Sequence, residues 1–175
     1  MLFRSLFNVS QTTFPTWAAT VDSNSGTLRS VSENLFAKNM HNTFIAGGVD
    51  IDLWLTSDGV FRAYSNLLTS LKRFPQTLDL KGGFKGLDMS AGGYGGGVGV
   101  ALAWDRDCPS NTAFGLSTPH LYEYQMSDWE WMQEDGAVLS RVPGFDLYEA
   151  NLFKYHELTT DKRNSHCQIQ DLTEA

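Results

Sequence analysis

The sequence predicts a mixed α+β fold, and three observations support this. Residues 32–46 and 57–73 carry apolar side chains at helical spacing. The last third of the chain contains short runs of β-branched and aromatic residues between turn residues. The length of 175 residues suits one domain, or one domain with an appended part. We therefore expect helices in the first half of the chain and a β-rich second half.

The first predicted helix follows an irregular segment. Residues 7–31 are rich in Thr, Ser and Asn, which favours extended or loop structure. Ser32 is a suitable N-cap, and the pair Gly47-Gly48 predicts the end of the helix. In residues 49–55, Val, Ile and Leu alternate with Asp and Trp. This period of two predicts a half-buried strand with the aliphatic residues on one face.

The second predicted helix is amphipathic. Thr56, Ser57 and Asp58 are suitable capping residues, and Phe74-Pro75 predicts the end of the helix. Two short strands are then predicted, at residues 77–80 and 84–88. The apolar face of the helix would consist of Val60, Tyr64, Leu67, Leu68 and Leu71.

A glycine-rich stretch predicts a mobile loop. Nine of the sixteen glycines lie in residues 82–99. Their order contains no G-x-G-x-x-G, and no Gly-Lys-Ser/Thr is present, so a phosphate-binding loop is not predicted. The centre of this flexible loop would be Gly92, Gly93, Gly95, Gly96 and Gly97.

Short strands are predicted from residue 98 onward. The tripeptide Glu134-Asp135-Gly136 predicts a hairpin turn between strands at 129–133 and 137–142. Residues 146–158 fit a strand or a helix by pattern, and their aromatic residues favour a strand. The other predicted strands are 98–104, 113–116, 121–125 and 166–172.

The net charge of −7 argues against a dedicated nucleic-acid-binding protein. Residues 1–50 carry a net charge of 0, residues 51–100 carry +1 and residues 101–175 carry −8. Nucleic-acid-binding proteins usually show a basic surface, whereas an acidic region faces solvent or the basic surface of a partner. The longest apolar run is far shorter than the ~20 residues of a membrane-spanning helix.

Few residues are arranged for catalysis or metal binding. Cys108 and Cys167 form no C-x-x-C motif and are expected to be free thiols. The four histidines lack the spacing of metal ligands. Asp105 and Asp107 flank Arg106 in a predicted turn, where local pairing is favoured over a carboxylate pair for acid–base catalysis. We therefore expect no enzymatic activity, no cofactor and no metal.

Aromatic residues of the second half are candidates for contacts. Trp129 and Trp131 would lie on one face of a strand. There they could stack on sugars or bases, but core packing or a subunit contact is favoured, as for Tyr148 and Phe153. A long antiparallel layout with large rings suits a lattice in which neighbouring copies cover strand edges and rings.

Residues 128–164 resemble the C-terminal peripheral-domain segment of tailed-phage major capsid proteins of the Hong Kong ninety-seven fold. The resemblance rests on the Trp-containing strand, the tip at 134–136, the motif Leu-Ser-Arg-Val-Pro at 139–143, Tyr148-Glu149-Ala150 and Thr-Asp-Lys-Arg-Asn at 160–164. Upstream, residues 53–68, 84–87 and 105–109 resemble the axial domain of that family, so the likeness covers about 50–172. The resemblance and the aromatic pattern together mark as subunit interface or core Trp129, Trp131, Arg141, Tyr148, Phe153 and Arg163.

The resemblance implies three parts of the chain. Residues 1–48 would hold an extended segment and the tail of a spine helix belonging to the peripheral domain. Residues 49–120 would form the axial domain, and 121–175 the C-terminal β region of the peripheral domain. Family chains begin earlier, with an N-terminal arm and an extended loop, so this chain resembles a C-terminal fragment that lacks both.

The resemblance also implies a function. It implies a non-enzymatic structural subunit that self-assembles through hexamers and pentamers into the icosahedral head of a virion. The head would enclose DNA without reading its sequence, and portal, scaffold and protease proteins would be further partners. Synthesis in the bacterial host cytoplasm and no membrane association are expected. Two alternatives stay open: a carbohydrate-binding module using the Trp129/Trp131 strand, and a small hydrolase using the acids at 105–107.

Overall fold

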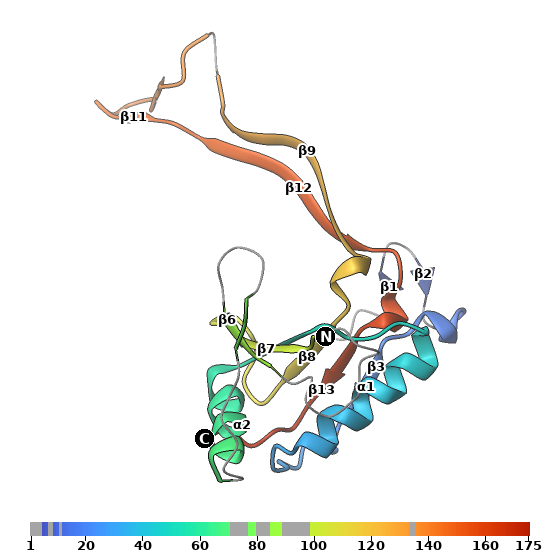
Figure 1. The fold of residues 1–175 in the computed structure, drawn as a ribbon. Coiled ribbons are helices and arrows are strands. Elements are labelled where there is room, and N and C mark those ends of the chain that lie inside the picture. Colours follow the sequence, from blue (N-terminus) through green and yellow to red (C-terminus); the bar gives the residue numbers. More distant parts are fainter. Residues whose placement is uncertain are drawn as a thin grey trace. The chain divides into compact units, whose positions relative to one another are not determined.

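The computed structural model describes residues 5–6, 9–10, 12–70, 77–79, 85–88, 99–133 and 136–175 (Figure 1). The chain divides into two units. The first, here called the sheet unit, joins residues 1–120 with residues 162–175. The second, here called the hairpin unit, consists of residues 121–161.

A seven-stranded mixed sheet forms the centre of the sheet unit. Its strand order is β3-β13-β8-β4-β7-β6-β5. The pairs β13–β3 and β4–β7 are parallel, and the other neighbouring pairs are antiparallel. The strands are β3 (Thr20–Asp22), β4 (Leu53–Thr56), β5 (Thr77–Asp79), β6 (Lys85–Asp88), β7 (Ala101–Trp104), β8 (Ala113–Leu116) and β13 (Cys167–Ile169).

Shorter elements complete this unit. A small antiparallel pair consists of β1 (Ser5–Leu6) and β2 (Val9–Ser10). The 3-10 turns in the described residues are η1 (Pro15–Trp17), η3 (Thr118–His120) and η4 (Arg163–Ser165).

Both helices confirm the predicted helical segments. They are α1 (Glu33–Gly47) and α2 (Asp58–Ser70). The Ser32 hydroxyl accepts a hydrogen bond of 3.3 Å from the Leu35 amide, as an N-cap does. At the other end of α1, Gly48 adopts a left-handed conformation with φ of 66°, which residues with a Cβ rarely take.

The core lies between the two helices and one face of the sheet. Phe36 of α1 meets the ring of Trp54 at 4.9 Å and the ring of Tyr64 of α2 at 5.7 Å, both edge to face. The strand register places Leu102 and Gly115 beside Trp54, so these residues share the buried face. Edge-to-face contacts add stabilisation to the burial of such large rings.

The buried side chains of β4 do not follow the division into aliphatic and other residues that the sequence pattern shows. The sequence pattern grouped Trp54 with acidic residues, opposite the leucines. In the structure Trp54 is fully buried, whereas Leu53 and Leu55 are half-buried. Phe36 of α1 and, through it, Tyr64 of α2 cover the face of β4 that carries the indole, so this face is the buried one.

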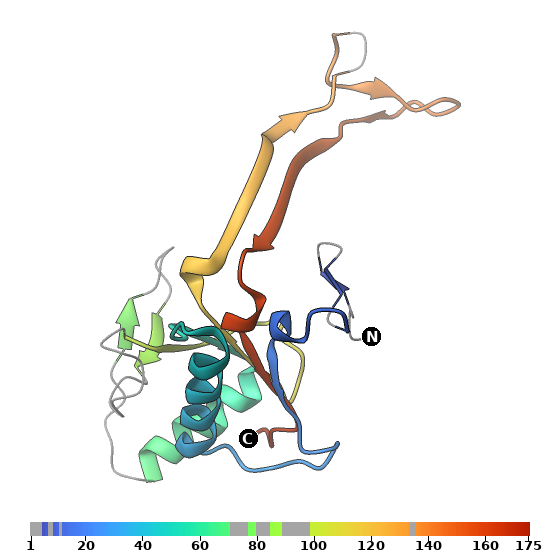
Figure 2. The same ribbon diagram turned by 90° about the vertical axis from the view of Figure 1, so that its right-hand side faces the viewer.

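The hairpin unit is a long two-stranded antiparallel ladder. The views agree that β9 (Leu121–Trp131) and β12 (Leu152–Thr160) run side by side (Figure 2). Between them in sequence, β10 (Ser140–Arg141) pairs with β11 (Tyr148–Glu149). The predicted pairing of 129–133 with 137–142 is wrong, because Trp131 lies opposite Leu152. The preference for strand in residues 146–158 is confirmed.

The two units divide the chain differently from the three predicted parts. Helix α1 and strand β13 belong to the same unit as residues 49–120. The assignment of segments to an axial and a peripheral domain stays a prediction. The predicted flexible loop at Gly92, Gly93, Gly95, Gly96 and Gly97 lies outside the described residues.

Candidate interaction surface

The hairpin unit has no buried apolar side chain among its described residues. Across the described parts of the chain, the buried apolar residues begin at Val31 and end at Leu172, and all of them belong to the sheet unit. A two-stranded hairpin by itself is marginally stable in water, because it lacks a second layer to pack against. The ladder of β9 and β12 therefore needs stabilising contacts beyond its own two strands.

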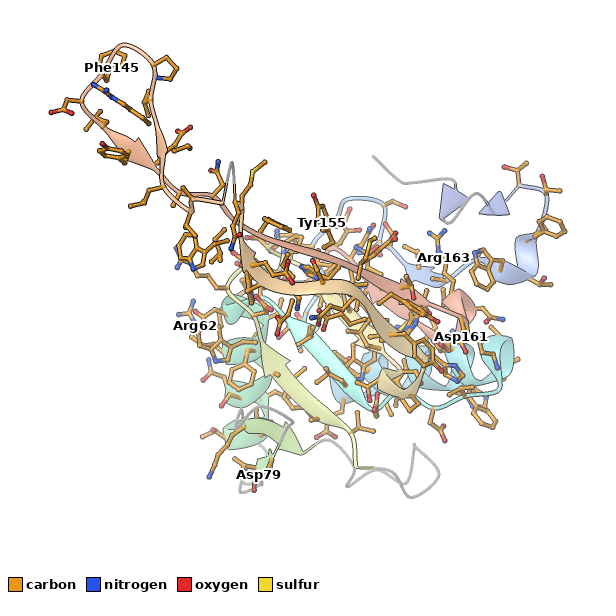
Figure 3. All side chains as sticks on the ribbon, turned by 90° about the horizontal axis from the view of Figure 1, so that it is seen from above. Arg62, Asp79, Phe145, Tyr155, Asp161 and Arg163 are labelled. Atoms are coloured by element: carbon orange, nitrogen blue, oxygen red, sulfur yellow. The ribbon has the colours of Figure 1, made fainter. Side chains whose placement is uncertain are left out.

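Large apolar side chains are concentrated on this unit. Of the nineteen that are exposed in the described residues, thirteen lie in the hairpin unit. Such a surface marks an interaction site in a soluble protein. Figure 3 shows two of these side chains, Phe145 in the loop between β10 and β11, and Tyr155 on β12. The full set is Tyr122, Tyr124, Met126, Trp129, Trp131, Met132, Leu139, Phe145, Leu147, Tyr148, Leu152, Tyr155 and Leu158.

The hairpin unit also carries the whole net charge of the chain. Residues 121–161 contain nine acidic residues and two basic ones, giving −7. The remaining residues contain eleven acidic and eleven basic residues, giving 0. A strong net charge of one sign helps to keep exposed apolar surface in solution, because like-charged molecules repel each other at a distance.

One polar cluster links the two strands of the hairpin. The Lys154 ammonium donates a hydrogen bond of 2.9 Å to the Glu123 carboxylate, and His156 Nδ1 lies 3.3 Å from the same oxygen. The hydrogen bond and charge of Lys154 lower the pKa of Glu123. The Lys154 side chain is only 16% exposed, so its aliphatic part covers other atoms of the ladder.

A shallow hollow lies along the ladder. Its volume is about 440 Å³, and it is lined by Tyr124, Gln125 and Met126 of β9 and by residues 154–157 of β12. The hollow combines aromatic, aliphatic and charged groups from both strands. Its lining does not include Trp129 or Trp131.

Comparisons with known proteins identify the fold. No protein-family model matches the chain, and no curated protein matches its sequence. Among solved structures, the SrpI encapsulin of Synechococcus elongatus PCC 7942 matches with a TM-score of 0.56, at 12% identity over 88% of this chain. The capsid of cyanophage A-1(L) matches with a TM-score of 0.53, at 19% identity over 95% of this chain. The chain has the Hong Kong ninety-seven fold.

This chain spans about half the length of the solved structures that it matches. The match covers 53% of the encapsulin chain and 53% of the cyanophage chain. Both of these neighbours with the Hong Kong ninety-seven fold are shell proteins, one of an encapsulin and one of a capsid. The predicted α+β class and the resemblance to capsid proteins are thereby confirmed at the level of fold.

The structure brings most of the predicted contact residues into the hairpin unit. Trp129 is 63% exposed, Trp131 52% and Tyr148 65%, so none of the three belongs to a core within this chain. Phe153 is half-buried and packs on Tyr155, with ring centroids 5.3 Å apart. The interface role of these residues stays a prediction.

The two predicted arginines lie in different units. Arg141 is exposed on β10 in the hairpin unit. Arg163 is half-buried at the start of η4 in the sheet unit, where it makes contacts of its own. Arg163 therefore belongs to a different unit from the aromatic residues with which it was grouped.

Several exposed residues were missed by sequence reasoning. Met126 is 91% exposed, and Tyr124, Leu147 and Leu158 are each at least 60% exposed. Apolar residues in a predicted strand are ordinarily assigned to a core. The signal that could have found them is the absence of a second amphipathic element within residues 121–161 to cover the strands.

Other chemistry in the described residues is local. Asp105 accepts a hydrogen bond of 2.8 Å from the Asp107 amide, so it shapes the predicted turn. Burial raises the pKa of the Cys108 thiol, and it raises the pKa of Cys167 to about 12.

No group of three metal-ligating side chains is found in the described part of the chain. Within that part, no helix combines the length and hydropathy needed to span a bilayer.

Proposed function

We propose that this chain is a structural subunit of a protein shell, of the kind that tailed phages build from major capsid proteins. The carrying observation is the hairpin unit, which exposes thirteen large apolar side chains and has no core among its described residues. Contacts between copies would cover this surface. Stable protein interfaces commonly bury ~1,600 Å² in total, and repetition by symmetry multiplies modest contacts. The fold of the two shell proteins supports the proposal.

The finer proposal is an icosahedral phage head built from hexamers and pentamers. The subunit would be made in the bacterial cytoplasm and reside in the virion, with packaged DNA inside and portal, scaffold and protease as partners. The acidic hairpin unit is compatible with close but non-adhesive contact with DNA, because like charges repel. The role would be structural, with no substrate converted.

Electron microscopy of the purified full-length gene product tests the proposal. The wild-type protein should form rings or closed shells. The double variant Trp129→Ser/Trp131→Ser should stay dispersed, because it removes two exposed rings from the hairpin unit. The matched control is Trp104→Ser, which removes an exposed Trp from the sheet unit. Wild-type protein that never forms rings or shells, or a double variant that assembles normally, contradicts the proposal.

The exposure of Trp129 and Trp131 also meets one requirement of the carbohydrate-binding alternative. Sugars stack on exposed aromatic rings, whereas rings buried in a core are inaccessible. Fluorescence titration of wild type and Trp129→Ala with a panel of sugars decides between the two functions. Saturable binding that the variant loses would favour the carbohydrate-binding module, and no binding by either protein would remove it.

A further inference from the structure

The two strands of the hairpin differ in how their outer edges are protected. In the described residues β9 and β12 pair with each other and with no other strand. An unprotected edge offers a row of backbone N–H and C=O groups to any extended chain. Natural proteins block such edges with bulges, charges, glycine or proline. The protection of each strand therefore indicates which edge is available for pairing.

Strand β9 is interrupted by two bulges. It has eleven residues, whereas β12 has nine, and the register leaves three residues of β9 (Met126, Asp128 and Trp129) and one of β12 (Lys154) without a directly opposed partner. Between the pairs Phe153–Glu130 and Tyr155–Ser127, β9 advances by three residues and β12 by two. The second extra residue is Met126. Bulges bend the strand and break the regular spacing of its edge groups.

Acidic side chains protect β9 further. Glu123, Asp128 and Glu130 give the strand a charge of −3. At the bulge, the Asp128 carboxylate accepts a hydrogen bond of 2.8 Å from the Trp129 amide. That amide is therefore already satisfied within β9 and is not offered to a further strand.

Strand β12 lacks the surplus of acidic residues, and the extra residues of both bulges lie on β9 rather than on β12. Its sequence, LFKYHELTT, contains no glycine or proline, and its one Lys and one Glu cancel in charge. Lys154 is already paired with Glu123 of β9. The other residues are chiefly aromatic, aliphatic and β-branched types, which favour strand pairing. A strand edge with this composition and no net charge is available for pairing with another strand.

We propose that β12 pairs antiparallel with β12 of a second copy across a two-fold axis, giving a four-stranded sheet in the order β9-β12-β12-β9. The inference rests on the proposed function, because it assigns one of the contacts through which copies associate. It identifies the partner surface as a second copy of the same strand.

The charge distribution favours the antiparallel direction of this pairing. Residues 128–149, at the far end of the ladder, contain six acidic residues and one basic residue, giving −5. Antiparallel pairing of two β12 strands places these acidic ends at opposite ends of the joint sheet. Nine residues at ~3.3 Å each separate them by roughly 30 Å, which exceeds the Debye length of ~8 Å several-fold. Parallel pairing would bring the acidic ends together.

Two-fold symmetry restricts which residues of the two β12 strands can lie opposite each other. In an antiparallel pair related by a two-fold axis, one residue must lie opposite its own copy. Directly opposed residues have Cβ atoms ~4.5–5.5 Å apart, which is close to the reach of a disulfide. A cysteine at that one position would therefore bond to itself across the axis.

A cysteine scan tests the proposal on the full chain. Single cysteines are placed at each position from Leu152 to Thr160 in a Cys108→Ser background, and Tyr124→Cys and Gln125→Cys on β9 are the matched controls. Cys167 stays, because it is buried. Under mild oxidation, one β12 position should give disulfide-linked dimers roughly 100-fold faster than either control, as expected when two thiols are held together rather than colliding at random. Urea unfolding of each variant confirms that it is folded.

The outcomes separate this inference from the proposed function. If no β12 position cross-links faster than the β9 controls, the pairing of β12 strands is wrong, even if shells form. If β12 dimers form but electron microscopy shows no ring or shell, the pairing stands and the shell function is wrong. Rapid cross-linking at several adjacent positions would also overturn the proposal, since a fixed two-fold register allows one self-opposed residue.

Discussion

The sheet unit and the hairpin unit differ in what stabilises them. The sheet unit packs two helices on a seven-stranded sheet and buries Phe36, Trp54 and Leu102 almost completely. The hairpin unit has a regular ladder but exposes its large side chains, and it carries all of the net charge. One unit is stabilised by its own core, and the other presents apolar surface that only further contacts can cover.

The comparison shows that tryptophan is a core residue in one unit and a surface residue in the other. Trp54 has no exposed surface and holds the core together, whereas Trp129 is 63% exposed and contributes nothing to a core. Substitutions should therefore change the free energy of unfolding in the sheet unit and association in the hairpin unit. Paired substitutions in the two units test whether unfolding depends on the sheet unit and association on the hairpin unit.

The largest effect is expected from Trp54→Ala. Removal of a fully buried aromatic side chain should lower the free energy of unfolding by about 3–5 kcal/mol. The paired variant Trp129→Ala should change it by less than about 0.5 kcal/mol, as surface substitutions usually do. Urea denaturation followed by circular dichroism measures both. Equal losses of stability in the two variants would contradict the division.

A smaller effect is expected at Gly115. A Cβ at this position would lie 2.7 Å from Cys167 Sγ and 2.9 Å from Ile51 Cδ1, so the core must shift to accept it. Gly115→Val should cost about 1–3 kcal/mol of the free energy of unfolding, as overpacked cores do. The control is Ala150→Val, which adds volume at an exposed position of the hairpin unit. A thermal melt of both variants gives the comparison, and a stable Gly115→Val would refute tight packing here.

The pH dependence of stability should also distinguish the units. Burial alone would raise the pKa of Asp22, but hydrogen bonds from Asn39 and Arg29 outweigh it and hold that pKa below 3.8. A lowered folded-state pKa means that the stabilisation is complete above the unfolded value and is lost as pH falls through the folded value. The sheet unit should therefore lose stability below about pH 3.8.

The variant Asp22→Asn measures this contribution. At neutral pH it should cost about 1–3 kcal/mol, because the Arg29 guanidinium loses the charged partner of its 2.8 Å hydrogen bond. Below the folded pKa of Asp22 the variant and the wild type should converge. The control Glu123→Gln removes an exposed ion pair of the hairpin unit and should leave the unfolding of the sheet unit unchanged at every pH. A pH-independent loss in Asp22→Asn would contradict the assignment.

Local elements of the fold could be predicted from the sequence. The Ser32 cap and the glycine at the end of α1 act over one helical turn, so their effect is visible in neighbouring residues. The inward face of β4 could not be predicted, because Trp54 is buried by helices that lie elsewhere in the sequence. The pairing of β13 with β3 could not be predicted either, because it joins residues about 145 positions apart in the sequence.

The candidate surface could be predicted in part. The alternation around Trp129 and Trp131 indicated a strand with large rings on one face, and a subunit contact was among the interpretations. Pattern alone does not reveal whether a partner element covers a strand, so exposed Met126 and Leu158 went unnoticed. Arg163 was grouped with the aromatic residues because it lies in the motif Thr-Asp-Lys-Arg-Asn of the resemblance, but the chain re-enters the sheet unit at residue 162.

Hydrogen exchange with mass spectrometry, on free subunits and on assembled particles, tests most directly whether the hairpin unit depends on other copies for its order. Amides of residues 121–161 should exchange quickly in the free subunit and become strongly protected in the particle, while those of β4, β7 and β8 should be protected in both. Equal protection of residues 121–161 in both states would show that the ladder is stable by itself, and the assembly role assigned to it would be wrong.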